Sequence, residues 1–481
     1  MSLRASQHAA DRRDLGRGAV VNLVGNLFKL ADPVLLVAVA VRYGTEAYGL
    51  FFVAQAITLL LLRVCLVGMD KALLWWIPRE RDRDPTPLFR RAAWISISLA
   101  TLVTLIVASV ASGSLMEQIG RPAAAATGLR LLVLSLPVLA MLELLTHATM
   151  GARRMETNMV VKDVVQPIVF PSIALVFAAL GLQSTGLGWA YLVSNLAGLA
   201  VAYVGYRRQF HGAPEGTASP PGLLRYALPM WAAEVSNSLL QRVDVLLVEA
   251  LTSNFALVGV WGIVTKLSNS LRAIRRSFDP IVASIAADPD VAHDRLRAVM
   301  SRATVMVSAL QVPVVAFLFV FVDDVLGWFG GQFDAAGVPL LVLASGWLVA
   351  STVGLAGVAL YARGHSTLHL ANILGTIATV TALGLYAIPR WQLVGAAASV
   401  VGGYLAQAVA QAIQLRRRTG VWGFDRTSAR PLLAGFVATA AAAGVHLSAT
   451  GMPDLPARIA TFAAFALTYG GVLYTTVLRK R

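Results

Sequence analysis

Apolar runs of about 20 residues, separated by short polar breaks, recur along almost the whole chain. The hydrocarbon core of a bilayer requires helices of this length, because the backbone there must satisfy its own hydrogen bonds. The composition agrees, since 57% of the residues are hydrophobic and only 14% are charged, against about 25% charged in a soluble globular protein. The pattern excludes an ordinary soluble enzyme and predicts an all-α, polytopic integral membrane protein with about 14 transmembrane helices.

The predicted spans form two groups on either side of one polar linker. Residues 207–225, RRQFHGAPEGTASPPGLLR, combine Pro, Gly and charge, and such a segment cannot remain in hydrocarbon without partners for its backbone. Six spans are predicted before this linker and eight after it, near residues 18–41, 49–74, 91–113, 129–150, 160–181, 186–206, 228–251, 255–276, 302–322, 337–360, 367–388, 393–414, 431–448 and 457–477.

The distribution of Lys and Arg predicts the orientation of the chain. Thirty of the 40 Lys and Arg residues fall in segments on one side of this alternating topology, and five fall in the opposite loops. Because Lys and Arg stay on the cytoplasmic side during insertion, both termini are predicted to be cytoplasmic. The same bias accounts for the net charge of +15 without a nucleic-acid partner.

Several kinds of chemistry are absent from the sequence. A single cysteine, Cys65, excludes an intramolecular disulfide and a cysteine-based zinc site, and the seven histidines form no HExxH pair. No GxxxxGK[ST] motif, soluble domain or catalytic constellation is found, which argues against an ATP-driven pump. We therefore predict no catalytic residues, no metal site, no cofactor and no enzymatic activity.

Cations inside the predicted spans are candidate functional residues, because each central Lys, Arg or Asp costs about 2.5 to 3.5 kcal/mol to insert. Arg63 and Arg242 have no acid at i±3 or i±4 on their own helices, so we expect them to face a cavity. Lys266 lies in the eighth span. Acids also lie within the spans, and the charge sum alone does not name the substrate.

Two further pairs of charged or titratable residues lie within spans at helical spacing. Lys29 and Asp32, at i,i+3, either neutralise each other structurally or serve function. Glu143 and His147, at i,i+4, lie on one face of the fourth span. Their spacing is compatible with hydrogen bonding between helices and with a proton relay, and the sequence leaves both open.

The two halves of the chain also show a short internal sequence similarity. Aligning residues 22–60 with residues 232–270 places Tyr48-Gly49-Leu50-Phe51 over Val258-Gly259-Val260-Trp261. Because the first and seventh spans both begin in the cytoplasm, such a repeat is parallel, with its pseudo-twofold axis along the membrane normal.

Five segments of the chain carry a resemblance to a known family. They are RYGTEAYGLFFVAQAI, GMDKALLWWIPRERD, LLRYALPMWAAEVSNSLLQRVDVLLVEALTSNFALVGVW, LGWFGGQFDAAGVPLLVLASGW, and the Ile388-Pro389 turn followed by LVGAAASVVGGYLAQA. In this order they resemble the polysaccharide-exporting branch of the multidrug/oligosaccharidyl-lipid/polysaccharide (MOP) superfamily, which includes Wzx-type O-antigen flippases. The chain departs from the pattern at Trp261, where Tyr is common, and in its scarcity of external polar loops.

The resemblance implies two six-helix lobes and a C-terminal pair of helices. Residues 1–206 would form the N-lobe, 207–225 a cytoplasmic linker, 226–415 the C-lobe and 416–481 the C-terminal pair. It also implies alternating-access export of an undecaprenyl-diphosphate-linked oligosaccharide across the bacterial cytoplasmic (inner) membrane, for O-antigen, capsule or exopolysaccharide biosynthesis. The expected partners are the lipid bilayer, this lipid-linked glycan and, as a further candidate class, other polysaccharide-assembly proteins, with no nucleic acid.

An exported diphosphate needs groups that replace its hydration. Arg63 and Arg242 are the leading candidates, because the guanidinium fork suits phosphate oxygens, and Lys29 and Lys266 are second-rank ligands. Membrane potential alone is one candidate driving force. Coupling to H⁺ or Na⁺ is the other, with Asp32, Glu143 and His147 as the candidate coupling residues.

Other functions remain open from the sequence alone. An organic-cation or drug antiporter of the same superfamily would need acids to dominate its cavity. A non-transporting cell-envelope assembly protein would use cytoplasmic faces such as RERDRDPTPLFRR to recruit a partner. An integral-membrane enzyme is a weaker alternative, because no carboxylate pair or metal-ligand spacing supports it.

Overall fold

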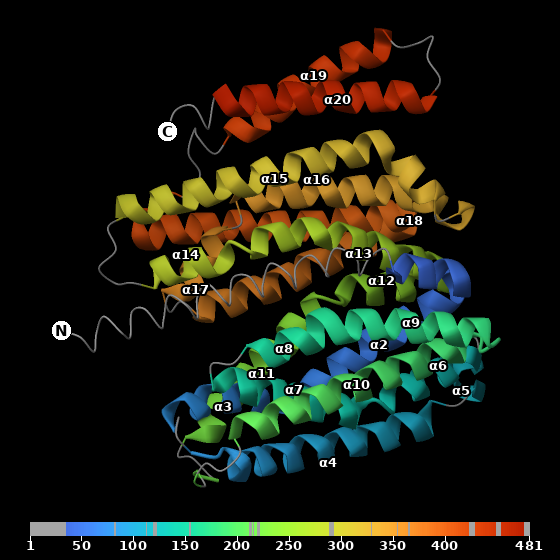
Figure 1. Cartoon of the computed structure of the whole chain (residues 1–481), viewed down its shortest axis with the longest axis vertical. Coiled ribbons are helices and arrows are strands. Elements are labelled where there is room, and N and C mark those ends of the chain that lie inside the picture. Colours follow the sequence, from blue (N-terminus) through green and yellow to red (C-terminus); the bar gives the residue numbers. More distant parts are fainter. Residues whose placement is uncertain are drawn as a thin grey trace. The chain divides into compact units, whose positions relative to one another are not determined.

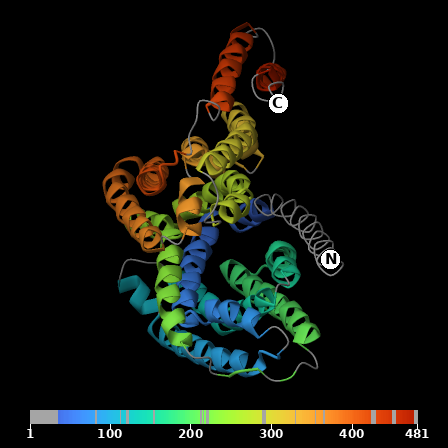
Figure 2. The ribbon, with the colours of Figure 1, turned by 90° about the vertical axis from the view of Figure 1, so that its left-hand side faces the viewer.

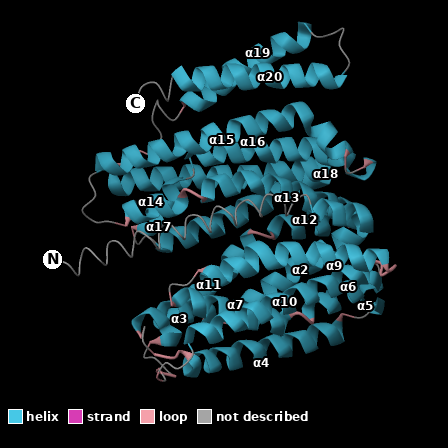
Figure 3. Cartoon of the chain, viewed as in Figure 1, coloured by secondary structure: helices cyan, strands magenta, loops and turns pink. Residues whose placement is uncertain are grey.

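The computed structural model describes residues 35–80, 83–111, 113–118, 123–152, 155–210, 214, 216–218, 222–287, 293–328, 330–353, 355–363, 366–422, 429–448 and 454–475. Over these residues every regular element is a helix (Figure 3). Most of the predicted first span, with Lys29 and Asp32, lies outside the described residues, although residues 35–43 are helical.

Within the described residues, eight helical segments are long and apolar enough to cross a membrane. They are Thr45–Leu66, Thr86–Val110, Ala124–Gly151, Glu156–Ala179, Ser184–Phe210, His293–Gly327, Gly331–Val353 and Thr367–Thr419. The predicted class, an all-α polytopic membrane protein, is confirmed. Apart from the first, the other predicted spans fall on shorter or more polar helices of the described residues.

Two of the predicted spans are interrupted and two are merged. The span at 228–251 forms α11 (Leu223–Leu240) and α12 (Val243–Thr252), and the span at 49–74 breaks near Val67. The spans at 367–388 and 393–414 share one long element, α18 (Ser366–Thr419), which contains a kink at Gln392 with φ 46° and ψ −121°.

The chain divides into two compact units. The first unit contains residues 1–242 and 253–259, and the second contains residues 243–252 and 260–481. The division thus falls after Arg242 and not within the polar linker at 207–225. The lobe boundaries implied by the resemblance stay a prediction.

In the first unit, α7 is almost entirely buried and packs against α3, α4 and α10 (Figure 1). The elements of this unit are α2 (Thr45–Leu66), α3 (Met69–Trp76), η1 (Ile77–Arg79), α4 (Thr86–Val110), α5 (Gly113–Gln118), α6 (Ala123–Val133), α7 (Leu136–Gly151), α8 (Glu156–Met159), η2 (Val160–Val165), α9 (Gln166–Ala179), α10 (Ser184–Phe210), α11 and the first turn of α13 (Phe255–Arg276). A helix buried on all sides in this way is the natural place for internal polar contacts, because its polar groups must find partners within the protein.

In the second unit, α16 packs against α15 and α18, and α19 lies against α20 (Figure 2). Its elements are α12, the rest of α13, α14 (Asp279–Ala286), α15 (His293–Gly327), η3 (Gly331–Ala336), α16 (Gly337–Val353), α17 (Leu355–Ala362), α18, α19 (Arg430–Ser448) and α20 (Asp454–Leu473). Small side chains of α19, such as Ala434 and Ala438, allow close packing around Val312 and Phe465.

Two glycines mark a close helix crossing within the first unit. A Cβ atom on Gly49 of α2 would overlap the carbonyl oxygen of Phe255, and one on Gly259 of α13 would overlap the carbonyl oxygen of Thr45. The relation is reciprocal, because each glycine meets the residue four positions before the other. The internal sequence alignment places Gly49 over Gly259. The two glycines are thus related at the crossing in the way that a parallel repeat predicts.

Candidate functional site

Five titratable side chains form a buried charge cluster in the first unit. We use this name for Arg63 of α2, Asp70 of α3, Glu143 and His147 of α7, and Lys162 of η2. The two acids and the histidine are deeply placed, with 3% of the Asp70 side chain, 9% of the Glu143 side chain and 8% of the His147 side chain exposed. The cations are more accessible, with 24% of Arg63 and 32% of Lys162 exposed.

Glu143 lies at the centre of this cluster. Its Oε1 is 2.7 Å from the Lys162 ammonium and 3.7 Å from the Arg63 guanidinium. Its Oε2 is 3.4 Å from Nδ1 of His147, one helical turn further along α7. Because that ring nitrogen is also 2.8 Å from the Glu143 carbonyl oxygen, the His147 ring is held against the backbone of its own helix.

Asp70 also contacts Arg63 and His147, which are two of the partners of Glu143. Its Oδ2 is 3.5 Å from Arg63 and 3.8 Å from Nε2 of His147. Arg63 therefore bridges both acids with its two terminal nitrogens, as the planar guanidinium fork permits. Neither Asp70 Oδ2 nor Glu143 Oε2 accepts a hydrogen bond from the described residues. The acids thus keep unused acceptor capacity inside the protein.

Local backbone geometry brings these residues together. Between α2 and α3, Val67 and Gly68 have φ angles of 48° and 72°, and this turn sets Asp70 beside Arg63. No residue with a side chain fits at position 68, because its Cβ atom would overlap the Ala227 carbonyl oxygen of α11. Lys162 comes from the π-helical turn η2, a type of turn that is frequent at functional sites.

Arg242 lies at the end of the first unit, after α11. Its guanidinium donates to the Ser238 carbonyl oxygen over 2.9 Å and to the Ser238 hydroxyl over 3.0 Å. Arg242 follows α11 and so lies on none of the elements that carry the buried charge cluster.

The structure brings together some of the residues that the sequence singled out. Arg63, Glu143 and His147 meet in the buried charge cluster, and the acids that Arg63 lacks on its own helix come from α3 and α7. Lys266 lies in the second unit and makes no ion pair with another described residue. The substrate and coupling roles assigned to these residues stay predictions.

Two members of the cluster were not among the candidates from the sequence. Asp70 is seven positions after Arg63, beyond same-helix spacing, and only the turn at Gly68 makes them neighbours. Lys162 lies near one end of the predicted span at 160–181, and its long side chain reaches the Glu143 carboxylate. The spacing of these residues in the sequence predicts neither the Asp70–Arg63 contact nor the Lys162–Glu143 contact.

An arginine trio in the second unit was also missed. Arg272, Arg275 and Arg276 follow one another at i, i+3 and i+4 at the end of α13, where they were counted only as cytoplasmic charges. Arg275 lies 3.4 Å from the Asp279 carboxylate. Three guanidinium groups and this carboxylate act on one another electrostatically, so positive charge is in excess here.

Aromatic rings complete the surroundings of the arginine trio. The Arg272 guanidinium carbon lies 4.4 Å from the Trp347 ring centroid and 4.9 Å from the Tyr404 ring centroid. The Trp347 Nε1 is buried and has no hydrogen-bond partner among the described residues. An excess of forked donors beside aromatic rings suits an anion that carries a ring, such as a sugar phosphate.

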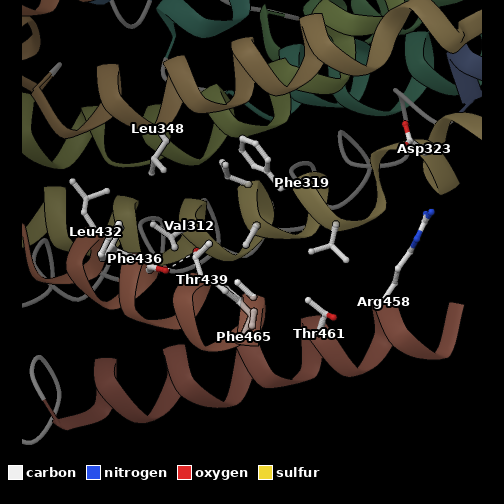
Figure 4. A pocket seen from close by; sticks show the side chains of 16 residues that line it. Val312, Phe319, Asp323, Leu348, Leu432, Phe436, Thr439, Arg458, Thr461 and Phe465 are labelled. Atoms are coloured by element: carbon white, nitrogen blue, oxygen red, sulfur yellow. Dashed lines mark hydrogen bonds between the residues drawn. The ribbon is translucent and has the colours of Figure 1, made fainter. Parts of the chain in front are cut away.

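A separate apolar pocket lies among α15, α16, α19 and α20 of the second unit (Figure 4). Its volume is about 730 Å³, and its lining includes Val312, Phe319, Leu348 and Phe436. Figure 4 shows Arg458 extending toward one end of it, where this residue pairs with Asp324 over 2.5 Å. The lining suits hydrocarbon and not sugar or phosphate. No group of three or more His, Cys, Asp or Glu able to hold a metal ion occurs among the described residues.

Solved structures that are similar to this chain include membrane transporters. Lipid II flippase MurJ, in an inward closed conformation, superposes with a TM-score of 0.73 at 10% identity, covering 96% of this chain and 99% of that chain. A multidrug resistance MATE family transporter of the MOP superfamily, in an inward-facing conformation, gives a TM-score of 0.64 at 17% identity over 82% and 98%. A MOP superfamily transporter from Pyrococcus furiosus, described as having a binding pocket of reverse polarity, gives 0.58 at 17% identity over 83% and 92%.

Sequence comparison identifies the family directly. No curated protein matches the chain. The model of the family described as polysaccharide biosynthesis protein matches residues 15–287, which is more than half of the 481 residues. This match confirms the family that the resemblance indicated, and MOP superfamily transporters share the fold, so the chain belongs to the polysaccharide biosynthesis protein family.

Proposed function

We propose that this protein translocates an undecaprenyl-diphosphate-linked oligosaccharide from the cytoplasmic to the outer leaflet of the bacterial inner membrane. The export would serve the biosynthesis of O-antigen, capsule or exopolysaccharide, and would proceed by alternating access. Family membership supports a role in polysaccharide biosynthesis, and the transporter fold supports movement of a substrate across the membrane. Its structural relative MurJ is a lipid II flippase.

The observation that carries this proposal is the arginine trio beside its aromatic rings. A sugar-diphosphate head cannot cross hydrocarbon unaided, because its charges and hydroxyl groups would lose their water. Arg272, Arg275 and Arg276 present more positive charge than Asp279 offsets, so a diphosphate would find an excess of cationic donors beside them. Trp347 and Tyr404 offer faces and edges against which a sugar ring can pack.

The first unit would contribute cations of a different kind. In the buried charge cluster Arg63 and Lys162 are matched by Asp70 and Glu143, so an anion there competes with two carboxylates. We therefore assign Arg63 and Arg242 a supporting contact with the diphosphate, with Lys266 and Lys29 in the second rank. The unused acceptors on Asp70 and Glu143 favour uptake of H⁺ or Na⁺, with His147 between them, as the coupling step. Asp32 stays a candidate coupling residue.

An organic-cation antiporter is the second candidate function. The observation in its favour is that both acids of the charge cluster are buried, more deeply than its Arg and Lys. Each of them is already paired with a cation, which leaves no net negative charge for a cationic drug. The arginine trio argues further against this candidate, because it would repel such a substrate.

Transport by reconstituted protein tests the proposal. In proteoliposomes containing a lipid-linked oligosaccharide, we expect Arg272→Ala to lower the rate of translocation at least tenfold and Arg272→Lys to restore it in part, because Lys returns the charge without the fork. Arg295→Ala is the matched control, since Arg295 is exposed at the start of α15, in the same unit. Equal rates in all variants would refute the assignment of the trio.

A further inference from the structure

A polar pocket lies between two helix connections of the first unit and has a volume of about 570 Å³. One connection joins the helix at 35–43 to α2, and the other joins α9 to α10. Both turn at a glycine with positive φ, at 84° for Gly44 and 80° for Gly181. In the predicted topology both connections lie outside the cytoplasm. A pocket of this size accommodates a small molecule or a few sugar rings.

Two residues fix the two connections to one another. The Tyr43 hydroxyl donates to the Ala174 carbonyl oxygen over 2.8 Å, and the Arg42 guanidinium donates to the Ala178 carbonyl oxygen over 3.4 Å. Gly186 leaves room for this tyrosine, because a Cβ atom there would lie 2.5 Å from its hydroxyl oxygen. The frame of the pocket is therefore tied across two segments that are far apart in sequence.

Three other side chains that line the pocket keep their hydrogen-bonding capacity. Glu46, Gln183 and Ser184 form no side-chain hydrogen bond or ion pair with other described residues. Together they offer carboxylate and amide acceptors, an amide donor and a hydroxyl group that both donates and accepts. All three line one pocket, in which Glu46 and Gln183 are exposed, so they offer mixed groups to a ligand that is itself rich in donors and acceptors.

The charges of the pocket decide which ligand class fits. Arg42 and Glu46 offset one another, so neither a phosphate nor an organic cation is favoured. A single carboxylate is too few ligands for Ca²⁺, which takes six to eight oxygens. A polyhydroxylated, uncharged ligand meets every group present. We infer that this pocket binds sugar residues of the exported glycan after they reach the outer side, an inference that rests on the proposed function.

Binding of a soluble probe tests this assignment. The probe is the repeat-unit oligosaccharide released by hydrolysis from the host's own lipid-linked glycan, and calorimetry with the full-length protein in nanodiscs gives its Kd. We expect Glu46→Gln and Gln183→Ala each to weaken binding by about three- to tenfold, because the first replaces a carboxylate oxygen by an amide donor and the second removes an amide. Glu117→Gln and Gln118→Ala are matched controls, since these exposed residues of α5 lie on the same predicted side. We expect the controls to bind as the wild type does.

Site-specific labelling provides a second readout. Cys65 is the chain's single cysteine and is buried, so a cysteine introduced at Ser184 would be the accessible thiol. We expect Ser184→Cys to react with a membrane-impermeant maleimide in intact cells and to be protected by added oligosaccharide. Gln118→Cys should react without protection.

The outcomes separate this inference from the proposed function. The pocket assignment is overturned if the wild type shows no saturable oligosaccharide binding, or if pocket and control variants bind with the same Kd. Translocation of the lipid-linked form is measured independently on the same preparations. Wild-type translocation with unaltered binding by the pocket variants would refute the pocket alone. Pocket-dependent binding without translocation would support the pocket and refute the proposed function.

Discussion

The Lys162 ammonium lies 2.7 Å from a carboxylate oxygen of Glu143, and the two residues come from different helical elements of the first unit. The contact joins a π-helical turn to the most buried helix of that unit. An ionised carboxylate inside a membrane protein is stable only if such partners replace its water. The charge of Glu143 thus depends on groups that other helices supply, and movement of those helices would change it.

Glu143→Gln should destabilise the protein, because it leaves Lys162 and Arg63 without their shared partner. Removing one member of a buried ion pair costs about 3 to 5 kcal/mol, and we expect the lower end because Lys162 is partly exposed. Unfolding in detergent measures the loss. Glu234→Gln is the control, since the Glu234 side chain, which pairs with Lys71, is 25% exposed against 9% for Glu143, and we expect a smaller loss there. Equal losses of stability in the two variants would contradict the claim that burial makes the Glu143 carboxylate the more important one.

Glu143→Gln should also remove the pH dependence of transport if the cluster couples protons. The variant keeps the shape of the side chain and abolishes its ability to exchange a proton with His147, which lies 3.4 Å away. Initial rates of transport across a pH series, compared with the wild type, give the answer. Parallel pH profiles would assign Glu143 and His147 a structural role only.

Gly49→Ala and Gly259→Ala should each disrupt the crossing of α2 and α13. The added methyl group would overlap a backbone carbonyl oxygen of the other helix, and a backbone cannot yield as a side chain does. We expect loss of monodisperse protein in size-exclusion chromatography. Gly128→Ala is the control, because nothing lies within 4 Å of its Cβ position, and it should leave the protein intact or stabilise α6 by up to about 1 kcal/mol. A fully monodisperse Gly49→Ala protein would contradict the close crossing.

Acidification should release the linker at Thr217 from the loop that follows α3. The backbone N–H and the hydroxyl of Thr217 donate to Glu80 over 2.9 Å and 2.6 Å, and these bonds lower the pKa of Glu80 from its usual value. A lowered pKa in the folded state means that the contribution to stability is present above about pH 4 and is lost as the pH falls through the folded pKa.

Hydrogen exchange follows this release residue by residue. We expect the protection factor of the Thr217 amide to fall at low pH in the wild type, and to be low at every pH in Glu80→Gln. The Gly216 amide is an internal control, since it donates to the backbone carbonyl oxygen of Asp84 over 2.9 Å and that acceptor does not titrate. A Thr217 protection factor that does not change with pH would contradict the account.

Most of the helices could be predicted because hydropathy and length determine which segments cross a membrane. The predicted span at 186–206 falls within α10, and the span at 160–181 coincides closely with the segment Glu156–Ala179. The breaks could not be predicted, because they depend on single backbone conformations. Val67 has a φ of 48° within an apolar run, and hydropathy does not register such an angle.

The candidate site was predictable only where its residues share a helix. Glu143 and His147 are one turn apart, so their contact follows from sequence spacing. Asp70 and Lys162 reach the cluster through a turn and through packing between helices, which no pattern in one sequence encodes. Arg272 was read as one more cytoplasmic charge, because its contact with Trp347 joins residues that are far apart in the chain.

The most direct test of the central claim is translocation by the purified wild-type protein. Unilamellar proteoliposomes would contain a lipid-linked oligosaccharide, and an impermeant glycosidase added outside would report how much of the glycan becomes accessible with time. We predict that accessibility exceeds the fraction initially in the outer leaflet and approaches completion, whereas protein-free vesicles stay at the initial fraction. Accessibility unchanged by the protein, together with accumulation of an organic cation in the same vesicles, would contradict the account and favour the antiporter.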